Sequence, residues 1–280
     1  MVESAGTAEL LLQASRALRS PFVPDQLAEL SRCGAYLELV WPQLAPSIET
    51  AGFLGSALYM ADMALDAVEE VYQPILSRES LLGGALRASD LAEVETVLDV
   101  FHWVQPQMLL VFAALAEGWD APRVGGQGKP DPRLPSEREQ RHLESVVEFA
   151  SPSAGPLPEV AETVQLGSVP DLYRAVAVWP GYLEAVWAEL QHLVTYPLFR
   201  QRGRALYFYA RSSARFLAQP IKVSREALLA RGAEPAALDR AHAVIDASLP
   251  AVGTLMMHCE AMRVGLGLTT REVVRPPAPP

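Results

Sequence analysis

The strongest constraint on the fold of this 280-residue chain is a repeat within its own sequence. Residues 23–41 (VPDQLAELSRCGAYLELVW) align without a gap with residues 169–187 (VPDLYRAVAVWPGYLEAVW), and 8 of the 19 aligned residues are identical. Further matches keep an offset near 147: Ala57-Leu58-Tyr59 with Ala205-Leu206-Tyr207, Gln73-Pro74-Ile75 with Gln219-Pro220-Ile221, Ser77-Arg78-Glu79 with Ser224-Arg225-Glu226, and Val97-Leu98-Asp99 with Val244-Ile245-Asp246. Two copies of one unit pack as homodimers do, which predicts an intramolecular pseudo-dimer with a ligand site in its central cleft.

Apolar residues recur at spacings of three and four through most of the chain, which is typical of amphipathic helices. No segment shows the alternation of a strand, so we predict an all-α fold. The expected helices cover residues 8–18, 25–44, 51–71, 89–116, 137–149, 171–190, 202–217, 224–231 and 236–263. Pro106 and Pro250 interrupt two of them at corresponding places, and we expect each proline to kink or break its helix because it lacks an amide donor.

The distribution of glycine and proline suggests how the chain is divided. Residues 118–135 (GWDAPRVGGQGKPDPRLP) are rich in both and read as a linker. The predicted units are therefore a first helical repeat over residues 1–117, the linker, and a second repeat over residues 136–270. The proline-rich end, residues 271–280, is expected to be a disordered tail.

Charge and cysteine content limit the partners. The formal net charge of −10 argues against affinity for nucleic acid or an anionic membrane. Cys33 and Cys259 are far apart and form no CxxC pair, which fits a reducing compartment. The chain starts without a signal-like segment, and its longest apolar run, residues 108–116, is too short to span a bilayer. We expect a cytoplasmic monomer or homodimer that acts on a small molecule.

Asp25 and Asp171 occupy equivalent places in the repeat, each after Val-Pro at the start of a predicted helix. One interpretation is structural, because a carboxylate at a helix start accepts backbone amides and meets the positive end of the helix dipole. The other is catalytic, because a shielded carboxylate in the cleft acts as a general base. Both interpretations are open on these residues alone.

Gln105-Pro106 and His258-Cys259-Glu260 are the other segments that suggest chemistry. A side-chain amide beside a helix-interrupting proline is able to hold a water molecule, although a simple kink is the plainer interpretation. Adjacent residues on a helix point in different directions, so the His-Cys-Glu run does not predict a metal site. Zinc and nucleophile-elbow motifs are absent from the sequence.

Three segments resemble the group I (D,L-2-haloacid) dehalogenases, also called the halocarboxylic acid dehydrogenase family. These are residues 19–41, residues 97–126 with their proline and R-x-VGG ending, and residues 157–190. The resemblance covers about residues 10–265. It implies an all-α pseudo-dimer that hydrolyses 2-haloalkanoic acids of either hand without a metal or cofactor. An Asp of the second half would activate a water that attacks the halogen-bearing carbon directly, and an amide before a proline would place that water.

Carried over by position, the resemblance makes Asp171 the general base and Gln105 the water-placing amide. The positions that would bind the substrate are Phe22, Asp25, Pro170 and Ser248.

Several of these positions depart from the family pattern. Gln105 is one methylene longer than the family's Asn, Asp25 replaces an aromatic residue, and Pro170 replaces a serine. Ser248 stands where a further aromatic residue aligns. A second carboxylate repels an anionic acid and raises the pKa of Asp171, so the pattern predicts a more symmetric, more polar cleft that suits a neutral or cationic ligand.

Three functions are consistent with these residues. The first is a hydrolase of the haloacid dehalogenase type. The second is another cofactor-free hydrolase in which Asp25 and Asp171 act as a carboxylate pair. The third is a non-catalytic helical protein that binds a small ligand. Carboxylates turned into an enclosed pocket favour an enzyme, whereas carboxylates that cap helices at the surface favour the third.

Overall fold

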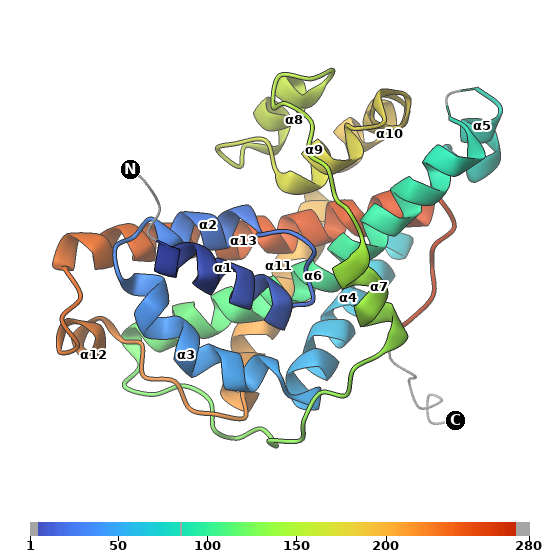
Figure 1. The fold of residues 1–280 in the computed structure, drawn as a ribbon. Coiled ribbons are helices and arrows are strands. Elements are labelled where there is room, and N and C mark those ends of the chain that lie inside the picture. Colours follow the sequence, from blue (N-terminus) through green and yellow to red (C-terminus); the bar gives the residue numbers. More distant parts are fainter. Residues whose placement is uncertain (1–4, 85, 273–280) are drawn as a thin grey trace.

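The computed structural model describes residues 5–84 and 86–272, and the chain over these ranges is helical without a β-strand (Figure 1). The predicted all-α class is confirmed. The helices are α1 (Ala5–Ala17), α2 (Asp25–Ser31), α3 (Tyr36–Ile48), α4 (Ala51–Val71), α5 (Arg78–Leu82), α6 (Ala88–Asp120), α7 (Glu137–Glu144), α8 (Leu157–Val164), α9 (Asp171–Val176), α10 (Pro180–Leu193), α11 (Pro197–Ser213), α12 (Arg225–Leu229) and α13 (Pro235–Gly265), with a short 3-10 turn, η1 (Ala214–Phe216), after α11.

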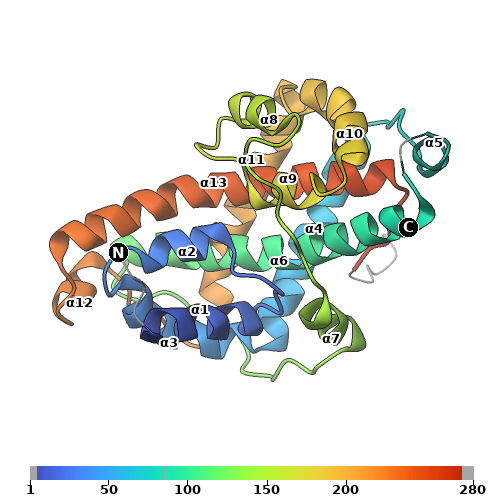
Figure 2. The same ribbon diagram turned by 45° about the horizontal axis from the view of Figure 1, so that its top comes forward.

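The centre of the molecule is formed by α6 and α13, which run antiparallel beside each other (Figures 1 and 2). Helices α4 and α11 pack against both of them. Neither proline breaks its helix, because α6 continues through Pro106 and α13 through Pro250, and the alternative of a kink at each proline stays a prediction. Both prolines lie in stretches rich in buried residues, where packing offsets the roughly 3 kcal/mol that an interior proline costs a helix.

The helix contacts keep their pattern when the two halves are exchanged. Helix α2 packs on α13 as α9 packs on α6, and α4 packs on α13 as α11 packs on α6. The same exchange relates the contacts of α1 and α3 with α2 to those of α8 and α10 with α9. This correspondence supports the pseudo-dimer predicted from the repeat, and it brings the starts of α2 and α9 to the middle of the molecule.

Helix ends differ from the expected ranges where the backbone conformation changes. The single helix expected over residues 25–44 is two, because Gly34 adopts a left-handed conformation (φ +62°) between α2 and α3. The helix expected over residues 171–190 is also two, and Pro180 is the first residue of the second, where a missing amide costs nothing. Helices α5 and α8 were not expected at all. Helix α7 ends at Glu144, before the predicted residue 149.

The segment between α6 and α7 crosses the surface without regular structure, although α6 extends to Asp120, inside the predicted linker. Isolated bridges from Thr50 to Pro132 and from Val124 to Ile221 fasten it to both halves. Gly125 (φ +86°) lies so close to the chain after η1 that a Cβ would stand 2.8 Å from the Gln219 carbonyl oxygen. The division into repeats and linker itself stays a prediction.

A cluster of charged residues ties α6, α7 and α13 to the last described residue, Glu272. Its members are Asp99, His102, Arg138, Glu260, Arg263 and Glu272. The ring nitrogens of His102 lie 2.5 Å from Glu260 Oε1 and 3.0 Å from Glu272 Oε1. At the start of the predicted disordered tail, Arg271 pairs with Asp66 and Glu272 pairs with His102, and the tail itself stays a prediction. The rest of that tail, residues 273–280, lies outside the described residues.

Helix α6 is long and apolar enough to cross a membrane by length and composition, although 94% of its apolar window is buried against other parts of the chain. Core helices of globular proteins pass the same test, so this is weak evidence for a membrane span.

Candidate active site

Asp25 and Asp171 are the first residues of α2 and α9, and each follows a proline in extended conformation. The preceding prolines, Pro24 and Pro170, have no side chain that caps the helix. Because α2 packs on α13 and α9 packs on α6, the two helix starts meet over the central helix pair. The repeat thus brings two aspartates 146 residues apart into contact.

The contact between them is not symmetric. The backbone amide of Asp25 donates to Asp171 Oδ2 across 3.0 Å. The Asp171 side chain is 11% exposed and the Asp25 side chain 47%. Arg174, one turn along α9, places its Nη1 3.5 Å from Asp171 Oδ1 and 3.9 Å from Asp25 Oδ2. The expected symmetry is absent because one carboxylate is enclosed and the other reaches solvent, and a cleft more polar than the family's stays a prediction.

Burial is the main cause of an unusual protonation equilibrium at Asp171. Together with the Asp25 carboxyl group, which hydrogen-bonds it and repels its negative charge, burial raises the pKa of Asp171 to about 8. The amide of Asp25 and the guanidinium of Arg174 act in the opposite direction and do not cancel the effect. Asp171 is therefore a carboxyl group that changes charge near neutral pH, as general acids and bases do.

The simple capping interpretation does not describe this pair. Among the described residues, neither carboxylate accepts a hydrogen bond from an amide of its own helix. Asp171 instead satisfies the first amide of α2 in the other half. It therefore has a structural contact, but its side chain is also enclosed and faces a cavity.

That cavity, called the apolar cavity below, has a volume of about 30 Å³ and brings Phe22, Gln105 and Asp171 together. Its other lining residues are Pro24, Gln26, Phe101, Val104, Met108, Leu172, Val252 and Leu255. The ring of Phe22 packs on the rings of Phe101 (5.2 Å between centroids) and Phe149 (5.3 Å). A space of this size holds a water molecule when polar groups line it.

Gln105 supplies such a polar group. The residue is 7% exposed, and its Oε1 atom is buried without a hydrogen-bond partner among the described residues. The neighbouring Gln107 is different, because its amide donates to the carbonyls of Leu18 (3.0 Å) and Trp103 (2.9 Å) and accepts from Arg133 (2.9 Å). Buried polar atoms are rarely left unpaired, so the free acceptor of Gln105 indicates a site for a water or a ligand.

A second hollow, called the polar cavity, adjoins the first. Its volume is about 70 Å³, and it shares Gln26 and Leu255 with the apolar cavity. The remaining predicted residues, Asp25, Pro170 and Ser248, all line it. The other lining residues are Glu29, Leu166, Ser168, Ala247 and Ala251. All six predicted site residues therefore lie on two adjoining cavities between the halves, and their roles stay predictions.

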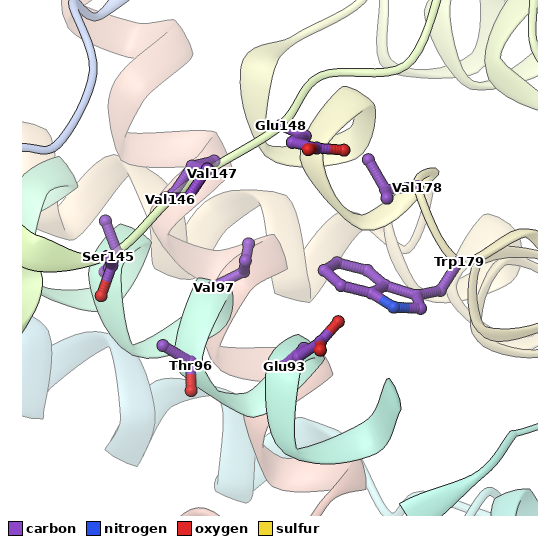
Figure 3. Close-up of a pocket in the computed structure, with 10 residues that line it drawn as sticks. Glu93, Thr96, Val97, Ser145, Val146, Val147, Glu148, Val178 and Trp179 are labelled. Carbon is purple, nitrogen blue, oxygen red and sulfur yellow. The ribbon is translucent and has the colours of Figure 1, made fainter. Parts of the chain in front are cut away.

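A larger groove of about 400 Å³ lies between the first half of α6, residues 145–148 and the end of α9, and the Trp179 indole points into it (Figure 3). Glu93 and Glu148 flank it. None of the predicted site residues lines this groove. The groove shares no lining residue with either cavity and is therefore distinct from both.

Two features of the site were not anticipated from the sequence. Arg174 was missed, although its spacing of three from Asp171 places it on the same helix face. The enclosure by Phe101 and Phe149 was missed because these rings come from distant segments.

The His258-Cys259-Glu260 run forms no metal site. His258 Nδ1 lies 3.0 Å from the Tyr173 hydroxyl, Cys259 donates to the Leu98 carbonyl, and Glu260 contacts His102. Over residues 5–84 and 86–272, no group of three His, Cys, Asp or Glu side chains is placed to hold a metal ion.

Comparison with known proteins places this site in context. The family model described as "Halocarboxylic acid dehydrogenase DehI" matches residues 21–143. An (R)-2-haloacid dehalogenase of Pseudomonas putida is 28% identical over 222 residues, which are 73% of this chain and 70% of that protein. A second one, from Rhizobium sp. (strain NHG3), is 25% identical over 202 residues, covering 70% and 77%. The resemblance predicted from the sequence is confirmed.

Solved structures agree on the fold. A complex of a D-2-haloacid dehalogenase mutant with D-2-CPA superimposes with a TM-score of 0.84 at 19% identity, over 94% of this chain and 92% of that one. A complex of a D-2-haloacid dehalogenase with L-LA gives a TM-score of 0.84 at 18% identity, over 95% and 93%. At these identities the likeness establishes the fold.

Proposed function

This chain is a relative of the 2-haloacid dehalogenases in sequence and in fold, and we propose that it hydrolyses the carbon–halogen bond of a 2-haloalkanoic acid. The observation that carries the proposal is one shared cavity. The Asp171 carboxyl group and the unpaired Oε1 of Gln105 line the same small, mostly apolar space. A water molecule there has an acceptor for each of its two protons.

The reaction follows from that arrangement. Gln105 Oε1 accepts one proton of the water in a hydrogen bond, and ionised Asp171 removes the other. The water oxygen forms a bond to carbon 2 as the carbon–halogen bond breaks, and the halide leaves with the bonding electrons. Attack opposite the leaving halide inverts the configuration at carbon 2. The products are a 2-hydroxy acid, a halide ion and a proton.

The cavity walls support this chemistry. The side chains of Phe22, Phe101 and Met108 exclude bulk water, so that Asp171 keeps a raised pKa and is a stronger base once ionised. A haloacid is larger than the apolar cavity, so the bound substrate extends past Gln26 and Leu255 toward the polar cavity. Arg174 provides the positive charge nearest the two aspartates and offsets part of their repulsion toward a substrate carboxylate.

The polar cavity favours one alternative, a cofactor-free hydrolase acting on another small molecule. Asp25 and Ser248 replace aromatic residues implied by the resemblance, and both line this cavity. The non-catalytic interpretation has less support, because the Asp171 carboxyl group is enclosed rather than placed at the surface.

Halide release from D- and from L-2-chloropropionate tests the proposal. We expect release by the wild-type protein and its loss in Asp171→Asn, with the helical circular dichroism retained. Asp131→Asn, at an exposed position of the segment between α6 and α7, is the matched control and should release halide at the wild-type rate. No release from either enantiomer by the wild-type protein would overturn the proposal.

A further inference from the structure

We propose that the polar cavity is a subsite for an ammonium group carried on the substrate chain, so that the preferred substrate is an amino-substituted 2-haloalkanoic acid. The inference rests on the proposed function and names the substrate class for the same site. Carbon 2 would lie in the apolar cavity beside Asp171 and Gln105, and the ammonium group would lie beyond Gln26 and Leu255.

Two carboxylates line this cavity from one helix. Asp25 and Glu29 are four residues apart on α2, so their side chains share a face of that helix. Within residues 5–84 and 86–272, Glu29 forms no ion pair, and the contact of Asp25 with Arg174 is long at 3.9 Å. A cationic ligand would supply the positive charge that these two carboxylates lack at this end of α2.

The hydroxyl group of a buried serine provides the second, independent observation. Ser248 is 5% exposed in the middle of α13 and lines the polar cavity. A serine inside a helix commonly donates to the carbonyl four residues earlier, here Val244, but Ser248 makes no such bond. In the described part of the chain its Oγ has no hydrogen-bond partner, so it is free to accept from a ligand.

The two ends of the cavity have different roles. Ser248 and Pro170 are buried, whereas Glu29 and Ser168 are exposed and mark the end that opens to solvent. An ammonium group has three donors, which match acceptors on Asp25, Glu29 and Ser248. An uncharged alkyl chain in the same place would leave these three acceptors to water.

Arg174 limits how strongly the subsite attracts a cation. Its guanidinium lies over the Phe149 ring (5.4 Å), donates to the Ala150 carbonyl (3.2 Å) and is shared between Asp25 and Asp171. One guanidinium therefore faces two carboxyl groups, those of Asp25 and Asp171, and no ion pair of Glu29 is found among the described residues. The ammonium group takes no part in the bond changes; water still replaces halide at carbon 2, and Asp171 still takes the proton.

Binding of stable product analogues tests the subsite separately from turnover. Isothermal titration calorimetry at pH 7.5 would compare 4-amino-2-hydroxybutanoate with 2-hydroxybutanoate, which lacks the ammonium group. We expect the amino compound to bind about tenfold more tightly to the wild-type protein, the usual gain from a hydrogen bond to a charged group. Asp25→Asn should lower the ratio of the two affinities severalfold, because one of the three acceptors loses its charge, without weakening 2-hydroxybutanoate.

Ser248→Ala should lower the affinity for the amino compound alone, and Glu162→Gln, an exposed change on α8, should leave both affinities unchanged. Equal affinities in the wild-type protein, or no binding of either compound, would overturn the polar subsite. Failure of the proposed function has a different signature, the absence of halide release from 2-chloropropionate.

Discussion

The backbone amide of Asp25 donates to the carboxyl group of Asp171 across 3.0 Å, so the first residue of α2 holds the first residue of α9. The hydrogen bond joins equivalent positions of the two repeats. It also fixes the Asp171 side chain in the cavity that Gln105 lines. The junction between the halves is therefore also the place where the reaction is proposed.

The pH dependence of halide release follows from the raised pKa of Asp171. The base must be ionised, and its pKa is about 8, so we expect kcat/KM to rise with pH and to level off above that value. Asp25→Asn should move the midpoint to lower pH because it removes the neighbouring carboxyl group. Burial remains the larger cause, so the midpoint should stay above the ordinary 3.8. An unchanged midpoint in Asp25→Asn, measured from pH 5 to 10, would contradict the coupling of the two aspartates.

Gln105 should matter for turnover more than for stability, because its Oε1 has no partner in the described part of the protein. Gln105→Leu removes the acceptor at similar volume, and we expect kcat to fall about 100-fold with little change in KM. Gln105→Asn keeps an amide and should retain more of the activity. Steady-state kinetics and thermal unfolding of both variants provide the check. A Leu variant with wild-type kcat would exclude Gln105 from placing the water.

The repeat made much of this predictable. Asp25 and Asp171 were recognisable as a pair because their flanking residues match, and the pairing of α6 with α13 follows from two related halves. Gly34 and Pro180 shortened the expected helices, since a left-handed residue and a helix-starting proline act over one turn and leave the apolar spacing intact. Helix α5 was detectable in principle, because Ser77 and Ser80 form a capping box at its start.

The exposure difference between Asp25 and Asp171 was not predictable. It depends on which distant side chains cover each carboxyl group, and residues such as Phe149 and Arg174 have no counterpart pattern in the repeat. The difference in hydrogen bonding between the side-chain amides of Gln105 and Gln107 was also not predictable. Both flank the same proline, but Arg133 from the segment after α6 and the Leu18 carbonyl satisfy only the second.

Replacing Asp171 should stabilise the protein at high pH. Its pKa in the folded state, about 8, lies above its ordinary value of 3.8, so the folded state keeps a proton that the unfolded state has lost between these values. Stability from this group is complete below about pH 3.8 and is lost as pH rises through 8. Asp171→Asn has no such titrating group. Its free energy of unfolding relative to that of wild type should therefore increase by on the order of 3 kcal/mol between pH 5 and pH 9. Urea unfolding at the two pH values measures the gain, and a difference that does not change with pH would contradict it.

Replacing a member of the charge cluster should lower the stability of the protein rather than raise it, because its buried ion pair stabilises the fold. His102 and Glu260 are almost fully buried, and removing one partner of such a pair costs about 3 kcal/mol or more. We therefore expect Glu260→Gln to lower the melting temperature by roughly 6–12 °C in a protein of this size, whereas the exposed change Glu162→Gln should have little effect.

Burial lowers the pKa of His102, but Glu260 and Glu272 outweigh it, so that the pKa is raised. The ion pair's contribution is complete below the ordinary His pKa of 6.5 and is lost as pH rises through the raised value. Thermal unfolding from pH 6 upward should show the two proteins converging, and a constant difference would contradict a change in the charge of His102 over this range.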